Sequence, residues 1–361
     1  MEGFFRAHHF ADKGAMTSTN SALAKKPRRG MKILAWSVGA LLVLGVGTWA
    51  TFTLSPWPGT LLVRWLFEAD AEKTNTELAA LVEPNSVDEF SDISYDDADP
   101  DALLDVYFPQ GLGANETLPT VVWVHGGGWV SGDKNQNDNY FRLIAAEGYT
   151  VVSLNYTIAP EGTYPLATHQ ILRALDFVSE QGESLHINAE NLILAGDSAG
   201  GQLAAQVATV VTSPVYAQET GFHTSLHAGQ LDGIILFCAA LDPNALQGDS
   251  PVLSSFINLV MWAYTGTKGY DDIMSQAAPI SHVTAEFPAA FISVGNGDGL
   301  APMSYNFAKR LDELGVPTDT LFFNEDHEPA LPHEYQFRLW ELDDAELAFD
   351  RMLSYLECVT E

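Results

Sequence analysis

The last two thirds of the chain alternates between short apolar segments and segments with helical spacing. The apolar segments lack helical periodicity and are typical of strands buried on both faces of a sheet. They occupy residues 120–129, 149–156, 191–198, 231–242, 289–298 and 318–323. Helical patterns lie between and after them, at residues 141–148, 169–181, 202–211, 306–315 and 343–355. This alternation predicts an α/β fold whose mostly parallel central sheet has helices on both faces.

One of these apolar segments runs directly into a G-x-S-x-G motif. Gly196, Ser198 and Gly200 form the motif, and a helical pattern rich in alanine and valine follows it. A strand, a tight turn and a helix in this order present a serine hydroxyl above the edge of a sheet, and the backbone N–H of Ala199 then points to where an oxyanion would form. Ser198 is therefore a candidate nucleophile, although glycine- and serine-rich turns also occur in α/β folds without this chemistry.

A second glycine-rich motif follows an earlier predicted strand. His125 and Trp129 enclose three consecutive glycines. Because glycine has no side chain, the backbone N–H groups of such a loop are unobstructed, and two of them would complete an oxyanion hole with that of Ala199. His125 itself is expected to be a structural residue of this loop rather than a catalytic base.

A nucleophilic serine on this kind of turn needs an acid and then a histidine later in the chain. Asp298 directly follows a predicted strand, at the sheet edge where Ser198 is expected, so its carboxylate can orient a histidine and stabilise the imidazolium. Two histidines, His327 and His333, follow the last predicted strand. Composition and spacing leave both open as the general base, whereas His282 is expected to be a structural neighbour of a cap.

Four motifs in this order and spacing carry a resemblance to a known family. They are HGGGW, NYTIAPEGTYP, GDSAGG and GNGDGL. Over about residues 100–356 the chain resembles the hormone-sensitive-lipase-like esterases of the α/β-hydrolase fold. This resemblance implies a carboxylic-ester hydrolase that needs no metal and no cofactor, with Ser198 as the nucleophile and Asp298 as the acid of its triad. It also implies three backbone donors for the oxyanion hole, at Gly126, Gly127 and Ala199.

The resemblance also separates the two histidines. In the family, the catalytic histidine usually has an aromatic residue two positions later. His333 has Tyr335 at that position, whereas His327 is followed by Glu328 and Pro329. We therefore expect His333 to be the base, in a loop longer than is usual for the family, and keep His327 as the alternative.

Residues 31–54 form a long apolar segment whose only charge is Lys32. A helix of this length, at about 1.5 Å per residue, can cross a bilayer core of about 30 Å. Trp36 and Trp49 lie toward its ends, as aromatic residues at a membrane interface do. The basic cluster before it predicts a cytoplasmic tail over residues 1–30 and a catalytic domain outside the cell membrane. The alternative is a cleaved signal peptide and a secreted enzyme.

The composition excludes several classes of protein. The net charge is −30, and seven of the 17 lysines and arginines precede residue 33, so the remainder is strongly acidic. Such a domain is unsuited to nucleic acids and to anionic membrane surfaces. Cys238 and Cys358 are the only cysteines, which excludes a disulfide framework or a cysteine-rich metal site.

The remaining segments predict the domain organisation. Residues 55–99 form a linker in which residues 60–82 look helical and partly amphipathic, and this helix would lie on the membrane or cover the active site as a lid. Residues 88–101 read as an acidic loop or strand-bearing linker, and residues 103–109 as the edge strand of a hydrolase domain over 100–361. Residues 243–286 interrupt the alternation and predict an inserted helical cap.

These features together predict a membrane-anchored serine hydrolase that acts on a small-molecule ester through an acyl-enzyme. Two alternatives use the same triad for acyl transfer or for peptide hydrolysis, since the fold does not decide between them. A third alternative is a non-catalytic binding module that keeps the hydrolase fold. The oligomeric state is left open.

Overall fold

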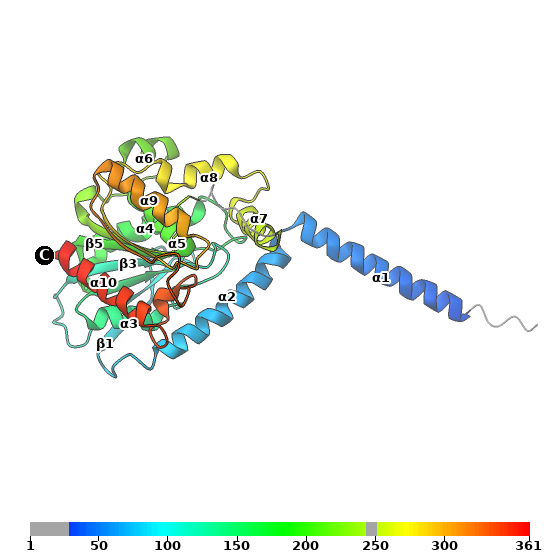
Figure 1. Cartoon of the computed structure of the whole chain (residues 1–361), viewed down its shortest axis with the longest axis horizontal. Coiled ribbons are helices and arrows are strands. Elements are labelled where there is room, and N and C mark those ends of the chain that lie inside the picture. The colour runs from blue at the N-terminus through cyan, green and yellow to red at the C-terminus, as the bar shows by residue number, and fades with distance from the viewer. Residues whose placement is uncertain (1–28, 243–250) are drawn as a thin grey trace, which may run out of the picture. The chain divides into compact units, whose positions relative to one another are not determined.

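The computed structural model of the protein describes residues 29–242 and 251–361 (Figure 1). These residues belong to two compact units that meet in the sequence between Thr51 and Phe52. The first unit contains most of helix α1 (Arg29–Leu54), whose apolar part, Ile33–Leu54, is long enough to cross a membrane. By length and composition this helix is either a membrane span or a signal sequence. The tail expected over residues 1–30 lies outside the described residues, except for the last two, which begin α1.

The second unit is built on an eight-stranded sheet with the order β1-β2-β4-β3-β5-β6-β7-β8 in the described part of the chain. The pairs β1–β2 and β2–β4 are antiparallel and all other pairs are parallel. The α/β fold with a mostly parallel sheet is thus confirmed. The strands are β1 (Val87–Ser94), β2 (Leu103–Pro109), β3 (Leu118–Val124), β4 (Thr150–Leu154), β5 (Ile187–Asp197), β6 (Leu231–Phe237), β7 (Ala289–Val294) and β8 (Thr318–Phe322).

The edge of the sheet differs from the prediction. The edge strand is β1, whereas β2, which the sequence predicts as the edge, lies second and is buried over most of its length. β1 joins the sheet through its backbone, with Phe90 opposite Val106, and most of its largely polar residues are exposed. A strand of this kind has no alternation of buried apolar residues, which is the signal that sequence patterns rely on. The sheet therefore begins before residue 100, where the hydrolase domain was expected to start.

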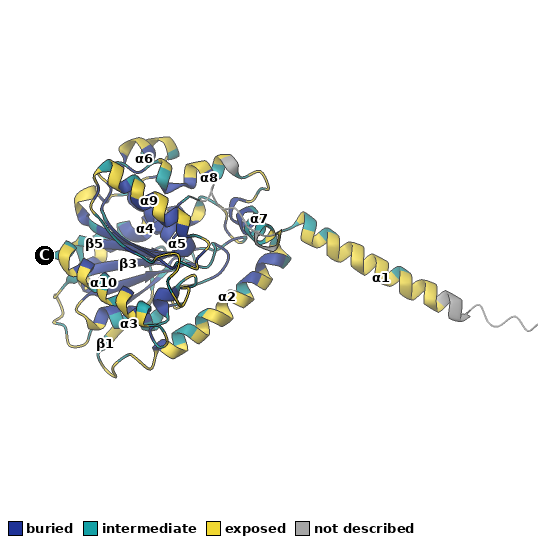
Figure 2. Cartoon of the chain, viewed as in Figure 1, coloured by how far each residue is buried: buried dark blue, intermediate teal, exposed yellow. Residues whose placement is uncertain are grey.

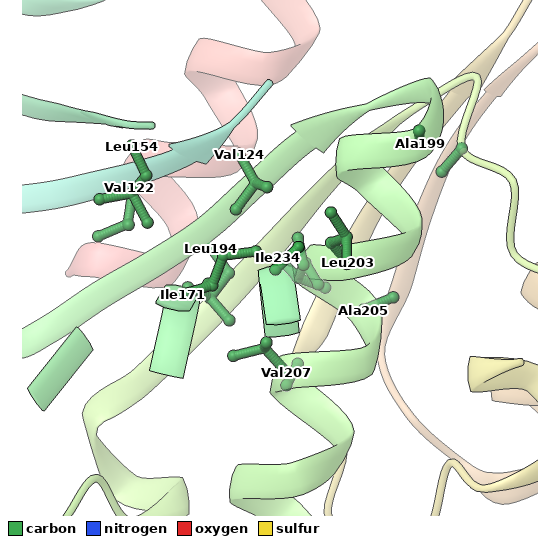
Figure 3. Close-up of a cluster of buried hydrophobic side chains, with 14 of the residues drawn as sticks. Val122, Val124, Leu154, Ile171, Leu194, Ala199, Leu203, Ala205, Val207 and Ile234 are labelled. Carbon is green, nitrogen blue, oxygen red and sulfur yellow. The ribbon is translucent and has the colours of Figure 1, made fainter. Parts of the chain in front are cut away.

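Side chains alternate between the two faces of the sheet and form a hydrophobic core on each. On one face Val122, Val124 and Leu194 pack with helices α4 (Leu166–Gln181) and α5 (Ser198–Thr212), and Figure 3 shows them in one cluster with Leu203 and Val207 of α5. On the other face the neighbouring strand residues, among them Trp123 and Ile193, pack with helices α3 (Asp138–Ala146) and α10 (Asp343–Thr360). The interior strands and α5 are accordingly buried, whereas the outer helices each keep an exposed side (Figure 2).

The helices before, between and after these strands follow the predicted alternation, although their first and last residues differ from the predicted ones. They are α2 (Trp57–Leu78), α3 (Asp138–Ala146), α4 (Leu166–Gln181), α5 (Ser198–Thr212), α6 (Pro214–Thr220), α7 (Pro251–Thr265), α8 (Asp271–Ala277), α9 (Ala301–Leu314) and α10 (Asp343–Thr360). Short 3₁₀ turns occupy Gly182–Leu185, Ala228–Gln230, Pro279–Ser281 and Tyr335–Phe337. Within the predicted cap, α7 and α8 are helical as expected, and residues 243–250 lie outside the described residues.

Candidate active site

Ser198 stands on a strained turn between β5 and α5. Its φ is +50°, in the left-handed region that a non-glycine residue occupies at a cost. The flanking glycines allow the turn because the chain passes very close to itself. A Cβ on Gly196 would lie 2.7 Å from the carbonyl oxygen of Gly200, and a Cβ on Gly200 would lie 2.1 Å from the carbonyl oxygen of Val124. The G-x-S-x-G pattern is therefore a steric requirement of this strand-turn-helix connection.

A chain of hydrogen bonds links Ser198, His333 and Asp298. Nε2 of His333 lies 3.0 Å from Oγ of Ser198, and Nδ1 lies 2.7 Å from Oδ2 of Asp298. The carboxylate of Asp298 is 2% exposed as a side chain, and its Oδ1 accepts a hydrogen bond from the backbone N–H of Leu300 at 2.8 Å. A carboxylate at Nδ1 holds the proton of a neutral imidazole there, which leaves Nε2 free to accept a proton from the serine hydroxyl.

The loop that carries His333 is fixed against the loop that carries Asp298. The backbone N–H of Leu331 donates to Oδ1 of Asn296 at 2.8 Å, and the backbone N–H of Gly297 donates to the carbonyl oxygen of Leu331 at 2.9 Å. A Cβ on Gly295 would lie 2.3 Å from that same carbonyl oxygen, so only glycine permits this approach. These contacts place the two loops together and bring His333 over Ser198.

The two other candidate histidines lie apart from this hydrogen-bonded chain. Nε2 of His327 is 2.8 Å from Oδ2 of Asp344, and its ring packs on Phe323 with 4.7 Å between ring centroids. Nε2 of His282 is 3.0 Å from the carbonyl oxygen of Ser275. His327 therefore joins the last loop to α10, and His282 joins the segments next to α8.

The loop from His125 to Trp129 lies directly beside the serine turn. Gly126 approaches Asp197 so closely that a Cβ would lie 2.1 Å from its Oδ2, and Gly127 has a φ of +103°. In the part of the chain that the structure describes, no acceptor is recorded for the backbone N–H of Gly126 or of Gly127. The loop therefore offers unengaged donors next to the N-terminus of α5, where Ala199 adds the N–H of a helix start.

His125 is a fully buried part of this loop. Its ring stacks on Tyr156 with 4.2 Å between centroids, and Nδ1 donates to the carbonyl oxygen of Gly126 at 2.8 Å. The hydroxyl of Tyr156 donates in turn to the carbonyl oxygen of His125 at 2.8 Å. Burial lowers the pKa of His125 to about 4, so the ring is neutral at physiological pH. These contacts indicate a structural role for His125 in the loop.

Three more ionisable groups surround His333. The carboxylate of Glu334 has Oε1 3.7 Å from Nε2 of His333, and the backbone N–H of Glu334 donates to Sγ of Cys238 at 3.2 Å. Burial raises the pKa of the Cys238 thiol to about 11. Burial and the nearby charge of Glu334 raise the pKa of Asp197 well above its usual range.

The pKa of His333 results from opposing effects. Burial lowers it, whereas the hydrogen bond to Asp298, the neighbouring Cys238 and the negative charge of Glu334 raise it, and the net direction is upward from 6.5. A general base works in its neutral form, so activity should rise as the pH increases through this raised pKa. The charge of Glu334, within 4 Å of the reacting nitrogen, should therefore move the acid limb of the pH profile to higher pH.

Glu334→Gln tests this effect. Because the substitution removes a negative charge that favours the imidazolium, the acid limb of the kcat/KM profile should move to lower pH, and the variant should keep a larger fraction of its maximal kcat/KM at pH 6. The measurement is kcat/KM for a p-nitrophenyl ester from pH 5 to 9. Glu286→Gln, which removes an exposed carboxylate that does not influence His333, should leave the limb in place. An unchanged limb in Glu334→Gln would contradict the electrostatic account.

A cavity of about 590 Å³ opens over the serine. This volume suits a small organic ligand. Ser198, Ala199, Gly127 and His333 line one part of it, while the walls come from α2, from α7 and from the segment after His333. The rings of Phe67 on α2 and Phe256 on α7 meet edge to face, 6.0 Å apart. The cavity thus joins the serine turn to two helices that are distant in sequence.

The ligand-type atoms of Cys238, Asp298 and His333 lie within 4.8 Å of one another. Both nitrogens of His333 are already engaged, one with Asp298 and the other with Ser198. Two members of this cluster, Asp298 and His333, are therefore already bonded to each other in the hydrogen-bonded chain described above.

Sequence reasoning missed several residues of the site. Asn296 and Glu334 are among them. The signal that could have indicated them is their position in the sequence, close to Asp298 and His333. The contribution of α2 to the cavity had only a weak signal, an amphipathic pattern compatible with either a lid or a membrane contact. The pattern contained no information on which side of the helix faces the serine.

Comparisons with known proteins identify the family of the chain and several relatives. The model of the Abhydrolase_3 family, described as alpha/beta hydrolase fold, matches residues 121–330. The chain is 28% identical to "Esterase LipI" of Mycobacterium tuberculosis over 224 residues, which is 59% of this chain and 66% of that protein. It is 29% identical to "Carboxylesterase NlhH" of the same organism over 237 residues, 64% of this chain and 70% of that one. The chain thus spans slightly less than two thirds of LipI.

Solved structures share this fold. The crystal structure titled "C6-C4 SN3 inhibited ESTERASE B from LACTOBACILLUS RHAMNOSIS" is 25% identical and has a TM-score of 0.72, with 84% of this chain and 97% of that chain covered. An esterase of Pyrobaculum calidifontis is 23% identical with a TM-score of 0.67, covering 83% of this chain and 94% of that chain, and shows the likeness of fold.

Proposed function

The chain belongs to the Abhydrolase_3 family of the alpha/beta hydrolase fold, as its resemblance to hormone-sensitive-lipase-like esterases predicts, and we propose that it is a serine hydrolase of carboxylic esters. The observation that carries the proposal is the position of His333, 3.0 Å from Oγ of Ser198 and 2.7 Å from Oδ2 of Asp298. These distances suit a nucleophile, a base and an orienting acid. The esterase names of the relatives support the same reaction class.

In the acylation step, Nε2 of His333 removes the proton of Ser198 as Oγ attacks the ester carbonyl. Asp298 stabilises the imidazolium that forms. The negative charge that develops on the carbonyl oxygen is met by the N–H groups of Gly126, Gly127 and Ala199. Each donor of this kind contributes about 10²–10³-fold to the rate. The imidazolium then gives its proton to the leaving alcohol, and the acyl group stays on Ser198 as an ester.

Deacylation repeats the same proton transfers with water. Nε2 of His333 removes a proton from water, whose oxygen attacks the acyl carbonyl, and the second tetrahedral intermediate uses the same three N–H donors. Its collapse breaks the bond to Oγ, returns the proton to Ser198 and releases the carboxylic acid. The residues that act are the same in both halves, so every step depends on His333 being neutral when it accepts a proton.

The cavity favours esters with an apolar acyl or alcohol part. Its walls near the serine include Phe67, Phe256, Val260, Met261 and Phe337, and its volume of about 590 Å³ admits a group of modest size. Apolar walls bind through the area that they remove from water. Short and medium acyl chains are therefore the expected substrates.

The test uses the full chain in detergent with p-nitrophenyl acetate, butyrate and octanoate, together with a fluorophosphonate probe. We expect turnover of the esters, with butyrate or octanoate preferred over acetate in kcat/KM, and stoichiometric labelling that peptide mapping assigns to Ser198. A protein that neither turns over these esters nor reacts with the probe would instead be a binding module on the hydrolase fold.

We further infer that α1 anchors the enzyme in the cell membrane, with the catalytic domain outside. The apolar stretch Ile33–Leu54, preceded by the basic cluster of Lys25, Lys26, Arg28 and Arg29, supports a single span in this orientation. An anchored enzyme stays in the membrane pellet after an alkaline carbonate wash. A cleaved signal sequence would release the enzyme, without residues 31–54, into the medium or the supernatant.

A further inference from the structure

Helix α2 has an inner and an outer face of different character. On the inner face Gly59, Thr60 and Val63 are buried, and Phe67 and Asp70 line the cavity. The outer face of the N-terminal half is exposed and apolar. Its large side chains are Trp57, Leu61, Leu62, Trp65 and Leu66, which are between 41% and 65% exposed. Such a group of large apolar side chains on one exposed face marks an interaction surface.

The apolar face is exposed because the helix is held in one orientation. Arg64 forms two hydrogen bonds of 2.7 Å with the carboxylate of Glu161, and its Nε donates to the carbonyl oxygen of Val130 at 2.8 Å. Farther along the helix, Oδ1 of Asn75 accepts from the backbone N–H of Asn139 at 2.9 Å. Gly59 contacts Leu259 of α7 so closely that a Cβ would clash with it. Contacts at both ends thus prevent α2 from turning its outer face inward.

The outer face becomes polar toward its C-terminal half. The exposed residues there are Glu68, Ala69, Glu72, Thr76 and Glu77. At about 1.5 Å per residue, Leu62 and Thr76 lie about 21 Å apart on the same face. A gradient from tryptophan and leucine to charged side chains within one helix fits a helix that enters a lipid interface with its N-terminal half only.

The chain itself brings this half of α2 to a membrane. Only Ser55 and Pro56 separate the end of α1 at Leu54 from the start of α2 at Trp57. Two such residues, at about 3.5 Å each, let Trp57 lie no more than about 10 Å from Leu54. If α1 spans the bilayer, α2 therefore begins at its surface.

We propose that the outer face of α2 from Trp57 to Leu66 lies in the interface of the bilayer that holds α1, and that the cavity takes ester lipids from that bilayer. The opposite face of the same helix lines the cavity, so one helix contacts both the lipid and the serine site. The partner is a zwitterionic or neutral lipid surface, because a chain with a net charge of −30 is repelled by anionic lipid. This inference rests on the proposed anchored ester hydrolase.

A fluorescence experiment on the full chain measures the depth of α2 directly. Cys358→Ser removes the exposed thiol and leaves Cys238 buried, so that Leu62→Cys or Thr76→Cys can be labelled with an environment-sensitive fluorophore. In phosphatidylcholine vesicles that contain brominated lipid, we expect strong quenching of the label at position 62 and little at position 76. Equal quenching at the two positions, or none at position 62, would overturn the proposal.

A kinetic experiment tests the consequence for substrates. Leu62→Glu should lower hydrolysis of a medium-chain 4-methylumbelliferyl ester dispersed in phosphatidylcholine vesicles by about tenfold, because a charged group replaces a leucine that the proposal places in the lipid interface. Its rate on soluble p-nitrophenyl acetate should not change. Thr76→Glu, on the polar half of the same face, should leave both rates unchanged. Equal rates of Leu62→Glu and wild type on the vesicle ester would contradict the proposal, whereas inactivity of all proteins on the soluble ester would refute the proposed function instead.

Discussion

Alanine in place of Ser198 is expected to lower kcat for p-nitrophenyl butyrate by about 10⁴-fold or more, because the acyl-enzyme cannot form without Oγ. The remaining rate should come from the oxyanion donors and from substrate binding, which the substitution leaves in place. KM should change little, since the cavity walls do not change. Steady-state kinetics with the full chain in detergent measures both quantities, and the fluorophosphonate probe should no longer label the protein.

Ser304→Ala is the matched control for this substitution. The hydroxyl of Ser304 is buried in α9 and has no hydrogen-bond partner among the described residues, so its removal should leave both the activity and the thermal unfolding of the protein almost unchanged. Ser198→Ala should unfold close to the wild-type temperature, because alanine keeps the backbone of the turn and removes only Oγ with its hydrogen bond to His333. If Ser198→Ala kept more than a tenth of the wild-type kcat, another nucleophile would have to carry the reaction.

The second large effect separates the two histidines. His333→Ala should lower kcat by about 10³–10⁵-fold, because Ser198 then has no base within hydrogen-bond reach. His327→Ala should keep kcat within a factor of about two to three, since its ring bonds to Asp344 and lies outside the hydrogen-bonded chain. The loss of that partly exposed hydrogen bond should lower the free energy of unfolding by about 1 kcal/mol. Parallel kinetics and urea unfolding of the two variants measure these effects.

The assignment of His333 as the base is wrong if the two substitutions have the opposite effects on kcat. A His327→Ala protein that folds normally but loses activity by more than a hundredfold would mean that the loop after β8 rearranges before catalysis. A His333→Ala protein with nearly full activity would exclude His333 as the base. Circular dichroism of both variants distinguishes a lost base from a lost fold.

The sequence was sufficient for the class of fold. The interior strands of the sheet, β3 to β7, are apolar on both sides because helices cover both faces, and such runs are visible without any alignment. The edge strand β1 was predicted only as one of two alternatives for residues 88–101, because its side chains face water and its stability comes from backbone hydrogen bonds to β2. Backbone pairing has no side-chain pattern, so a strand of this kind is established only when its partner is known.

Local rules also located two parts of the site. Ser198 directly follows β5 and Asp298 lies in the loop after β7, and the carboxyl ends of parallel strands share one edge of the sheet. The glycines on either side of Ser198 also indicate this turn, because the close approach of the chain to itself there excludes larger residues. These positions follow from connectivity and steric limits within a few residues, which is why the sequence by itself determined them.

The position of His333 was decided by tertiary structure. It lies in a long loop after β8 whose course depends on the contacts of Leu331 with Asn296 and Gly297, and no local pattern specifies such contacts. The orientation of α2 was also decided by tertiary structure, because its amphipathic sequence was compatible with either a lid or a membrane contact. The orientation set by Arg64 and Glu161 gives one face to the cavity and the other to solvent. The sequence by itself determined the candidate residues near each strand, and the packing of distant segments decided which of them meet.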